Sequence, residues 1–268
     1  MKRSVTILMW MCLSVAVYSQ KKKKSIVADR LEPIKEFIAT CNGYKKLPLH
    51  IEVEQRNTAF FPSSDEDTMT VNAEFTFTAA GSYIRYGNTE QFSDDSVMLV
   101  VSNDQRVMMV YPQEQNIEQL LTGLTGSFAT DSSLKKLDEI YSSQFLATEG
   151  ELAIVELRNR MPLPGTDQLK EKITMKYNSQ SKEPVEIIYL RRTVMPVDSA
   201  ESVGMENKLL KNEGEWFLIN ERVRTYQFKK ISHDATISLP VSIAQRIRKV
   251  SGEYVAAKGY EDYYISME

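Results

Sequence analysis

Met69–Thr78 (MTVNAEFTFT) alternates apolar and polar side chains at every second position. A period of two is typical of an antiparallel strand with one buried face. Short apolar segments follow it up to Pro112, and polar turns such as Ala80-Gly81 and Gly87-Asn88 separate them. The stretch from Asp67 to Pro112 therefore predicts a meander of four or five consecutive antiparallel strands.

The rest of the chain adds helices and further strands to this meander. Apolar residues at three- and four-residue spacing predict an amphipathic helix over Ser25–Cys41. Pro33 would be tolerated if the regular helix begins near Arg30 or Leu31, because proline fits the first turn of a helix. Two more helices are expected, one near Ile117–Gly126 and one from Ser132 or Ser133 to about Phe145. Alternation predicts the remaining strands, at Leu49–Glu54, Leu152–Leu157, Leu169–Tyr177, Val185–Arg191 and Trp216–Phe228. In the segment Val241–Glu268, residues Ile243–Ile247 fit the start of a helix, and the tyrosines fit either a strand or a packed tail.

The N-terminus has the pattern of a secretory signal peptide. Lys2 and Arg3 precede the apolar run Val5–Val17, which is shorter than the ~20 apolar residues of a spanning helix. An uncleaved membrane anchor is the alternative. We expect residues 1–19 to be a signal peptide cleaved after Ser19, residues 20–24 to be a basic spacer, and residues 25–268 to form one exported domain with a C-terminal extension.

Composition restricts the class of partner. Removal of residues 1–19 would shift the formal net charge from −3 to −5, and no basic stripe is present, which argues against nucleic acid. Cys41 would then be the remaining cysteine, so no intramolecular disulfide is expected. We interpret it as a small buried hydrophobic residue.

The sequence contains no recognisable catalytic or cofactor motif. His50 and His233 are the two histidines, and neither has the spacing of a metal site. Thr122–Gly126 lacks the lysine of a phosphate-binding loop, and the acidic loop Ser63–Asp67 lacks the spacing of a calcium loop. A serine triad with either histidine stays open as a distant alternative. We predict a non-enzymatic protein with no cofactor and no metal.

The order of elements resembles the periplasmic lipoprotein-carrier family of LolA and LolB. In that family a hairpin has an Asp-Gly turn, an aromatic residue on the returning strand and a Tyr-x-Pro-like exit. Over Met98–Pro112 this chain has Asn103-Asp104 at the turn, Met108-Met109 in place of the aromatic residue, and Tyr111-Pro112 at the exit. The resemblance covers roughly residues 25–230. It implies an α+β fold in which a curved antiparallel sheet, an incomplete β-barrel, has helices covering its open face, and it implies a periplasmic location.

A half-barrel of this kind would have an apolar interior. Methionine and branched or aromatic side chains on such a surface suit varied apolar ligands. The expected ligand-binding residues of this cavity are Met69, Val71, Phe75, Phe77, Met98, Val100, Met108 and Val110. In the alternative, the first helix and the Ile117–Tyr141 region fill the cavity.

Two functions are compatible with these observations. The first is a lipid-binding protein whose partner is a lipid or an acylated protein. The second is a scaffold or accessory subunit of a cell-envelope assembly that contacts an envelope protein through its sheet edges and its tyrosine-rich tail. Tyr254, Tyr260, Tyr263 and Tyr264 favour the second, because tyrosine is common at protein interfaces.

Overall fold

The computed structural model describes residues 27–43, 46–112, 131–164, 166–197, 209–212 and 215–267. The predicted signal peptide, the basic spacer and the predicted helix near Ile117–Gly126 lie outside the described residues. Across the ranges given above, no helix is both long and apolar enough to cross a membrane.

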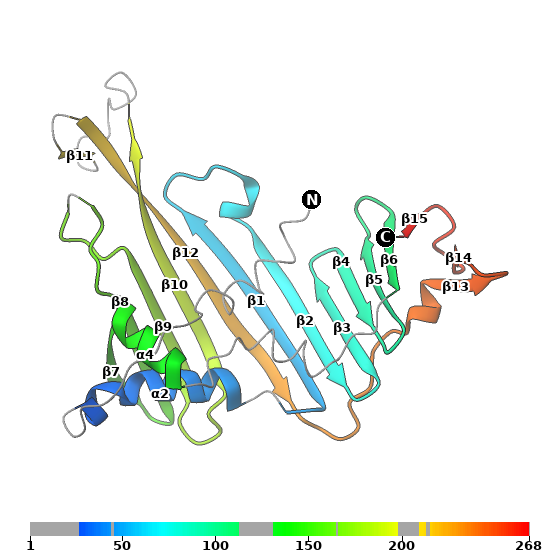
Figure 1. The fold of residues 1–268 in the computed structure, drawn as a ribbon, viewed down its shortest axis with the longest axis horizontal. Helices are drawn as coiled ribbons and strands as arrows, with labels where there is room; N and C mark the ends of the chain where they lie inside the picture. Colours follow the sequence, from blue (N-terminus) through cyan, green and yellow to red (C-terminus); the bar gives the residue numbers. More distant parts are fainter. Residues whose placement is uncertain are drawn as a thin grey trace.

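One large sheet forms the body of the protein, in the strand order β15-β6-β5-β4-β3-β2-β1-β12-β10-β9-β8-β7, with β11 paired to β12 beside this path (Figure 1). Neighbouring strands are antiparallel except for the parallel pair of β15 and β6. The order has two ends, β7 and β15, so the sheet is open rather than a closed barrel. The predicted fold class, α+β with an open antiparallel sheet, is confirmed. The strands of this sheet are β1 (Leu49–Ala59), β2 (Thr70–Thr78), β3 (Gly81–Tyr86), β4 (Thr89–Ser93), β5 (Val97–Ser102), β6 (Val107–Pro112), β7 (Tyr141–Glu149), β8 (Leu152–Asn159), β9 (Glu171–Asn178), β10 (Pro184–Pro196), β11 (Leu209–Asn212), β12 (Glu215–Ser232) and β15 (Tyr264–Met267).

The predicted meander is confirmed, because each strand from β2 to β6 pairs with the next one along the chain. Close backbone approach requires glycine at the start of β3. A Cβ atom at Gly81 would lie 2.5 Å from the carbonyl oxygen of Ser93 on β4. The close approach of β3 to β4 at this point therefore depends on this glycine.

Two described helices, α2 (Val27–Gly43) and α4 (Asp131–Ile140), lie over β7 and β8 at one end of the sheet (Figure 1). We call the side of the sheet that they cover the helix-bearing face. A buried cluster lies between the helices and the strands, and its members are Ile34, Phe37, Ile38, Leu137, Tyr141, Ala153, Val155, Leu157, Met175 and Tyr177. The described helices thus cover the β7–β8 end of the open face.

The structure corrects two predicted boundaries. Helix α2 includes Val27, so Pro33 lies inside it rather than in its first turn. Proline there removes one backbone hydrogen bond, and burial of the apolar side of the helix offsets that loss. Helix α4 ends at Ile140 and not near Phe145, because Tyr141–Glu149 pairs with β8 as a strand. Tyr141 and Phe145 are four residues apart, a spacing that suits one face of either element.

A second buried cluster lies in the middle of the sheet. Its described members all belong to strands β1, β2, β3, β10 and β12. We call it the central cluster, and its buried members are Leu49, Ile51, Val53, Ala73, Phe75, Phe77 and Tyr226. Ile84, Tyr86, Ile187, Phe228 and Ile231 are half-buried beside them.

The C-terminal segment, residues 239–267, packs on the opposite side of the sheet, over β3 to β6. It contains the short 3-10 helix η3 (Ile243–Gln245), the hairpin of β13 (Ile247–Val250) and β14 (Glu253–Ala256), and strand β15. We call this side the tail-bearing face. Its buried cluster consists of Tyr83, Phe92, Val97, Leu99, Val101, Met108, Val110 and Ile247. The segment thus starts with a short helix, continues as strands and packs on the sheet, so the expected helix start, strands and packed tail all occur in it.

A buried ion pair fixes this segment to the sheet. Arg246 Nε lies 3.0 Å from Glu90 Oε2 on β4, and the two side chains are 13% and 9% exposed. The guanidinium carbon of Arg246 also lies 4.7 Å from the centre of the Tyr260 ring. A charge-assisted hydrogen bond in such a protected place is stronger than a surface ion pair.

Candidate functional site

The pairing of the strands decides which side chains share a face. Residues directly opposite each other in an antiparallel pair point the same way, and the direction alternates along each strand. Following these pairs across the sheet places two rows of apolar side chains on the helix-bearing face. The first row, from β8 to β12, consists of Val155, Met175, Ile187 and Tyr226, and Tyr226 lies opposite the polar Gln55 on β1. The second row, from β1 to β3, consists of Ile51, Phe75 and Ile84, and packing in the central cluster joins it to Tyr226.

Five of the eight expected binding residues lie on this same face. Val71, Phe75 and Phe77 belong to β2, and Phe75 and Phe77 are buried in the central cluster. Met98 and Val100 on β5 also point this way, but Ser93 and Gln91 of β4 lie beside them. The surface is therefore continuous from β8 to β3 and interrupted by polar side chains at β4. Met69 lies just before β2 and is half-buried, with its carbonyl accepting a 2.8 Å hydrogen bond from the amide of Asn57.

Met108 and Val110 do not share this face. They pair with Val101 and Leu99, so they point to the tail-bearing face, where they are fully buried under the C-terminal segment. The expectation that they lie beside Met98 and Val100 therefore does not hold. Strand β5 is apolar on both sides, so its alternation gave no indication of which residues face which way.

Three arginines lie together on the helix-bearing face, and the sequence did not predict this group. Arg222 and Arg224 lie on β12, and Arg191 lies directly opposite Arg222 on β10. We call these three residues the arginine cluster. The sequence carried a signal for two of them, because Asn220, Arg222 and Arg224 interrupt an otherwise apolar set of even-numbered positions on one strand.

Hydrogen bonds orient two members of the arginine cluster. Arg224 Nε donates to Asn57 Oδ1 at 3.2 Å, and its Nη1 donates to the hydroxyl of Tyr226 at 3.4 Å. Arg222 Nη2 lies 3.2 Å from Asp67 Oδ2 and donates to Ser63 Oγ at 2.9 Å. The backbone amide of Ser63 and, more weakly, the Arg222 guanidinium hold the pKa of the Asp67 carboxyl below its usual value.

Neutral tyrosine hydroxyls surround the arginine cluster. Burial raises the pKa of Tyr86 to about 12, and burial together with Glu171 raises the pKa of Tyr189 and Tyr141 above their usual value. Tyr189 donates a short hydrogen bond to Glu171, the one acidic residue that faces this side from β9. These hydroxyls therefore stay protonated at neutral pH and act as hydrogen-bond donors.

Two buried side-chain oxygens on this face, Gln55 Oε1 and Ser82 Oγ, have no hydrogen-bond partner. Gln55 is 1% exposed, and its Nε2 donates to Asn57 Oδ1 at 2.9 Å. Its Oε1 accepts no hydrogen bond. An unsatisfied buried acceptor costs about 1–3 kcal/mol. A bound group that donates a hydrogen bond would remove that cost.

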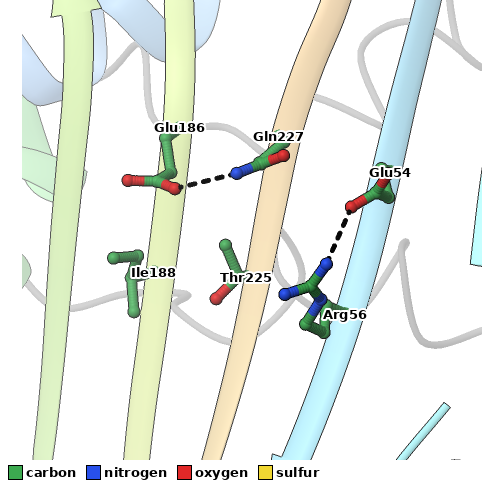
Figure 2. A pocket seen from close by; sticks show the side chains of 6 residues that line it. All are labelled: Glu54, Arg56, Glu186, Ile188, Thr225 and Gln227. Carbon is green, nitrogen blue, oxygen red and sulfur yellow. Dashed lines mark hydrogen bonds and ion pairs between the residues drawn. The ribbon is translucent and has the colours of Figure 1, made fainter. Parts of the chain in front are cut away.

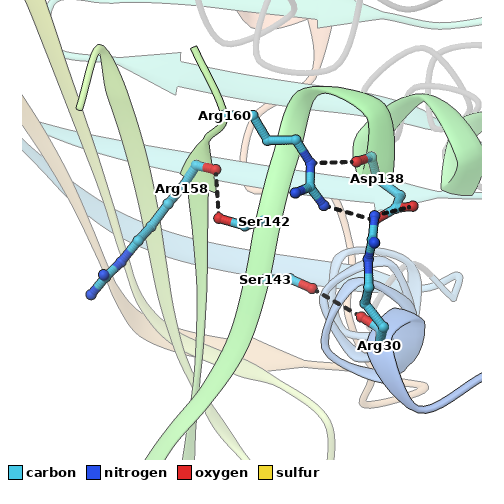
Figure 3. Close-up of polar contacts among 6 residues, drawn as sticks. All are labelled: Arg30, Asp138, Ser142, Ser143, Arg158 and Arg160. Atoms are coloured by element: carbon cyan, nitrogen blue, oxygen red, sulfur yellow. Dashed lines mark hydrogen bonds and ion pairs between the residues drawn. The ribbon is translucent and has the colours of Figure 1, made fainter. Parts of the chain in front are cut away.

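The helices are fastened to the β7–β8 end by polar contacts (Figure 3). Arg30 Nη2 on α2 donates to Asp138 Oδ1 on α4 at 2.9 Å and to Oδ2 at 3.0 Å. Arg160 Nη2, which follows β8, reaches the same carboxylate at 3.1 Å, and Ser143 Oγ on β7 donates to the carbonyl of Arg30 at 3.3 Å. Arg30 is largely exposed, so the pair with Asp138 adds at most about 1 kcal/mol of stability.

A cavity of about 210 Å³ lies on the other side of the sheet, across β1, β12 and β10 (Figure 2). Its lining side chains are Glu54, Arg56, Glu186, Ile188, Thr225 and Gln227. Gln227 Nε2 donates to Glu186 Oε1 at 3.5 Å, and Arg56 lies 3.6 Å from Glu54. Walls of this polarity do not suit an acyl chain, which needs apolar surroundings.

Neither histidine has the surroundings of a catalytic base. His50 Nδ1 lies 3.0 Å from Thr76 Oγ1, and its Nε2 lies 3.0 Å from Glu52 Oε1, which superficially matches a triad. Thr76 is only 1% exposed, so its hydroxyl cannot reach a substrate. His233 Nδ1 lies 2.8 Å from the carbonyl oxygen of Lys46. Among the described residues, no group of three or more potential metal ligands occurs.

Comparison with known proteins identifies similar solved structures. No protein-family model matches the sequence, and no curated protein matches it. The chain is similar to a LolA superfamily protein from Nitrosomonas europaea, with 11% identity, a TM-score of 0.26, and coverage of 76% of this chain and 94% of that one. It is also similar to an outer membrane lipoprotein-sorting protein domain from Vibrio parahaemolyticus, with 10% identity, a TM-score of 0.26, and coverage of 78% and 94%. The descriptions of both structures name the family that the order of elements resembles. Backbones with such a TM-score superpose poorly, so we draw no functional conclusion from these matches.

Proposed function

We propose that this protein is a non-enzymatic binding protein of the periplasm that holds the acyl chain of a lipid or of an acylated protein against the helix-bearing face. The observation that carries the proposal is the apolar surface that runs across this face from β8 to β3. It spans seven strands. Val155 and Met175 at its β8–β9 end are fully buried beside the helices, and the remaining five strands from β10 to β3 are roughly 20 Å wide at about 4.8 Å between strands.

This width suits an acyl chain. The hydrocarbon core of a bilayer is about 30 Å thick and contains two leaflets, so one extended chain of about 15 Å fits within the uncovered strands. Each methylene moved from water to an apolar surface contributes about 0.8 kcal/mol. Burial of a whole chain would therefore contribute on the order of 10 kcal/mol before ordering costs.

The half-buried residues of the central cluster are the expected contacts. Phe75 and Phe77 are already buried, whereas Ile84, Ile187 and Phe228 keep accessible surface. Ile187 packs against both the central cluster and the cluster beneath α2. It therefore lies where an acyl chain crossing the sheet would pass.

Adjacent isoleucines on β10 provide the test. Ile187 points to the helix-bearing face, and Ile188 points to the opposite face beside the polar cavity; both are half-buried. We expect the wild-type protein, purified from a periplasmic fraction, to retain a lipid mass in native mass spectrometry and to take up a fluorescent fatty acid. Ile187→Gln should weaken uptake at least about tenfold, the effect of losing roughly 1.4 kcal/mol, while Ile188→Gln should not.

Equal uptake by the two variants would place the acyl chain elsewhere. A wild-type protein that contains no lipid and takes up no fatty acid would refute the proposal. Thermal unfolding of both variants, followed by circular dichroism, separates a binding defect from a folding defect.

A scaffold function is the second candidate, and one observation favours it. Strand β15 lies at the end of the sheet order, where Tyr264 is 70% and Met267 is 57% exposed. The other three tyrosines of the tail, Tyr254, Tyr260 and Tyr263, pack against the tail-bearing face. If the protein is a scaffold, Tyr264→Lys should place a charge at this edge and abolish crosslinking to an envelope partner. The same variant should leave fatty-acid uptake unchanged.

A further inference from the structure

We infer that the ligand of the helix-bearing face carries a phosphate group, and that the arginine cluster binds it. This inference rests on the proposed function, since it names the class of lipid. It concerns Arg191, Arg222 and Arg224 on β10 and β12.

The arginine cluster directly continues the apolar surface. Arg224 is two residues from Tyr226 of the central cluster, on the same face of the same strand. At about 3.4 Å per residue, their Cα atoms are roughly 7 Å apart. On β10, Arg191 is four residues from Ile187, again on the same face. A ligand with a chain on the central cluster would therefore present its head group to the arginines.

Positive charge exceeds negative charge at this place. Asp67 forms an ion pair with Arg222, but the described part of the chain places no carboxylate within 4.0 Å of Arg191 or Arg224. Glu171, which lies opposite Arg191, accepts the short hydrogen bond from Tyr189.

Like charges directly opposite each other on a sheet are unfavourable. Arg191 and Arg222 are such a pair. An anion bound between them would relieve the repulsion, so a sheet that keeps both arginines is suited to an anionic ligand.

The hydrogen-bonding geometry fits a phosphate. A guanidinium presents planar pairs of N–H groups that match phosphate oxygens, and it does not lose its charge. Asn57 and Tyr226 hold the Arg224 side chain in place, which reduces the entropy lost on binding. The Gln55 Oε1 without a partner lies next to Asn57 on β1 and could accept a hydrogen bond from a hydroxyl or amine of the same head group.

The test compares two lipids with the same acyl chains and different head groups. Phosphatidylglycerol has a net negative head group, and phosphatidylcholine has a phosphate neutralised by its own ammonium group. With the full protein and native mass spectrometry, we expect phosphatidylglycerol to bind about tenfold or more tightly, as charge-assisted hydrogen bonds would provide. Arg191→Gln and the double variant with Arg224→Gln should remove this preference, so that both lipids bind with similar affinity.

Arg192 is the matched control. It neighbours Arg191 in the sequence but points to the opposite face, where it forms an ion pair with Glu221. Arg192→Gln should keep the preference for phosphatidylglycerol. Arg191 is exposed, so its replacement is not expected to disturb the fold. If the double variant fails to fold, the lipid preference of Arg191→Gln alone tests the inference.

Titration with inorganic phosphate distinguishes a site for a lipid head group from a site for free phosphate. Weak, arginine-dependent phosphate binding together with lipid binding would support a head-group site. If phosphate binds and neither lipid does, the arginine cluster is an anion site and the proposed function fails. Equal binding of both lipids, unaffected by Arg191→Gln, would overturn the inference and leave acyl binding intact. Binding of neither lipid and no phosphate would overturn both.

Discussion

Removal of the Arg246 guanidinium should detach the C-terminal segment from the tail-bearing face. The side chain forms the 3.0 Å ion pair with Glu90, and Glu90 Oε1 also accepts a 3.2 Å hydrogen bond from the Tyr83 hydroxyl. Breaking a buried pair on one side leaves the other charge without compensation, which costs about 3–5 kcal/mol. Loss of the contact with the Tyr260 ring adds roughly 0.5–2 kcal/mol. Both side chains of the pair are slightly exposed, and contact with water weakens the two contributions. We therefore expect Arg246→Ala to lower the free energy of unfolding by about 3–5 kcal/mol in total.

Urea unfolding followed by circular dichroism measures this free energy, and a double-mutant cycle with Glu90→Gln isolates the pair. Arg248→Ala is the control, since Arg248 lies two residues away on β13 and is exposed. It should change the free energy of unfolding by no more than about 0.5 kcal/mol. The reasoning is refuted if Arg246→Ala costs less than about 1 kcal/mol, or if its effect and that of Glu90→Gln simply add.

Three further predictions follow from burial, backbone space and charge. Met108→Ala should lower the free energy of unfolding by about 2–5 kcal/mol, and Met109→Ala by about 1 kcal/mol or less, because Met108 is fully buried and Met109 is half-buried on the other face; equal losses in urea unfolding would contradict the register. Gly81→Ala should lower the melting temperature by several degrees, since its Cβ would lie 2.5 Å from the Ser93 carbonyl oxygen; an unchanged calorimetric melting temperature would count against that close approach. The Asp67 pKa is lowered in the folded state, so its stabilisation should be fully present above the ordinary value of 3.8 and disappear as the pH falls through the folded pKa; acid unfolding of Asp67→Asn should lack this component, and an identical pH profile would exclude it.

The sequence predicted the first half of the sheet well. In β2 the apolar side chains occupy alternate positions, and strong turn residues bound most of the following strands, so local information was sufficient. The boundary between α4 and β7 could not be predicted in the same way. Tyr141 and Phe145 fit either a helix or a strand, and pairing with β8, a contact outside the segment, decides between them.

The candidate site was predictable only in part, for a related reason. Val71, Phe75 and Phe77 were placed on one face by alternation within a single strand. Met108 and Val110 were misplaced because β5 is apolar on both sides, so only its pairing register with β6 reveals the faces. The arginine cluster depends on the pairing of β10 with β12, which no local pattern contains.

The long strand β12 also has a consequence for how the chain folds. β1 to β6 form one run of neighbouring strands and β7 to β10 another, and within the described chain these two runs meet in the sheet only through β12, which pairs with β1 on one side and β10 on the other. Each run can pair locally, whereas the contact between β12 and β1 closes a loop of more than 150 residues. Such non-local pairing is slow to form. We therefore expect the two half-sheets to appear first, and their joining by β12 to be the step that limits the folding rate.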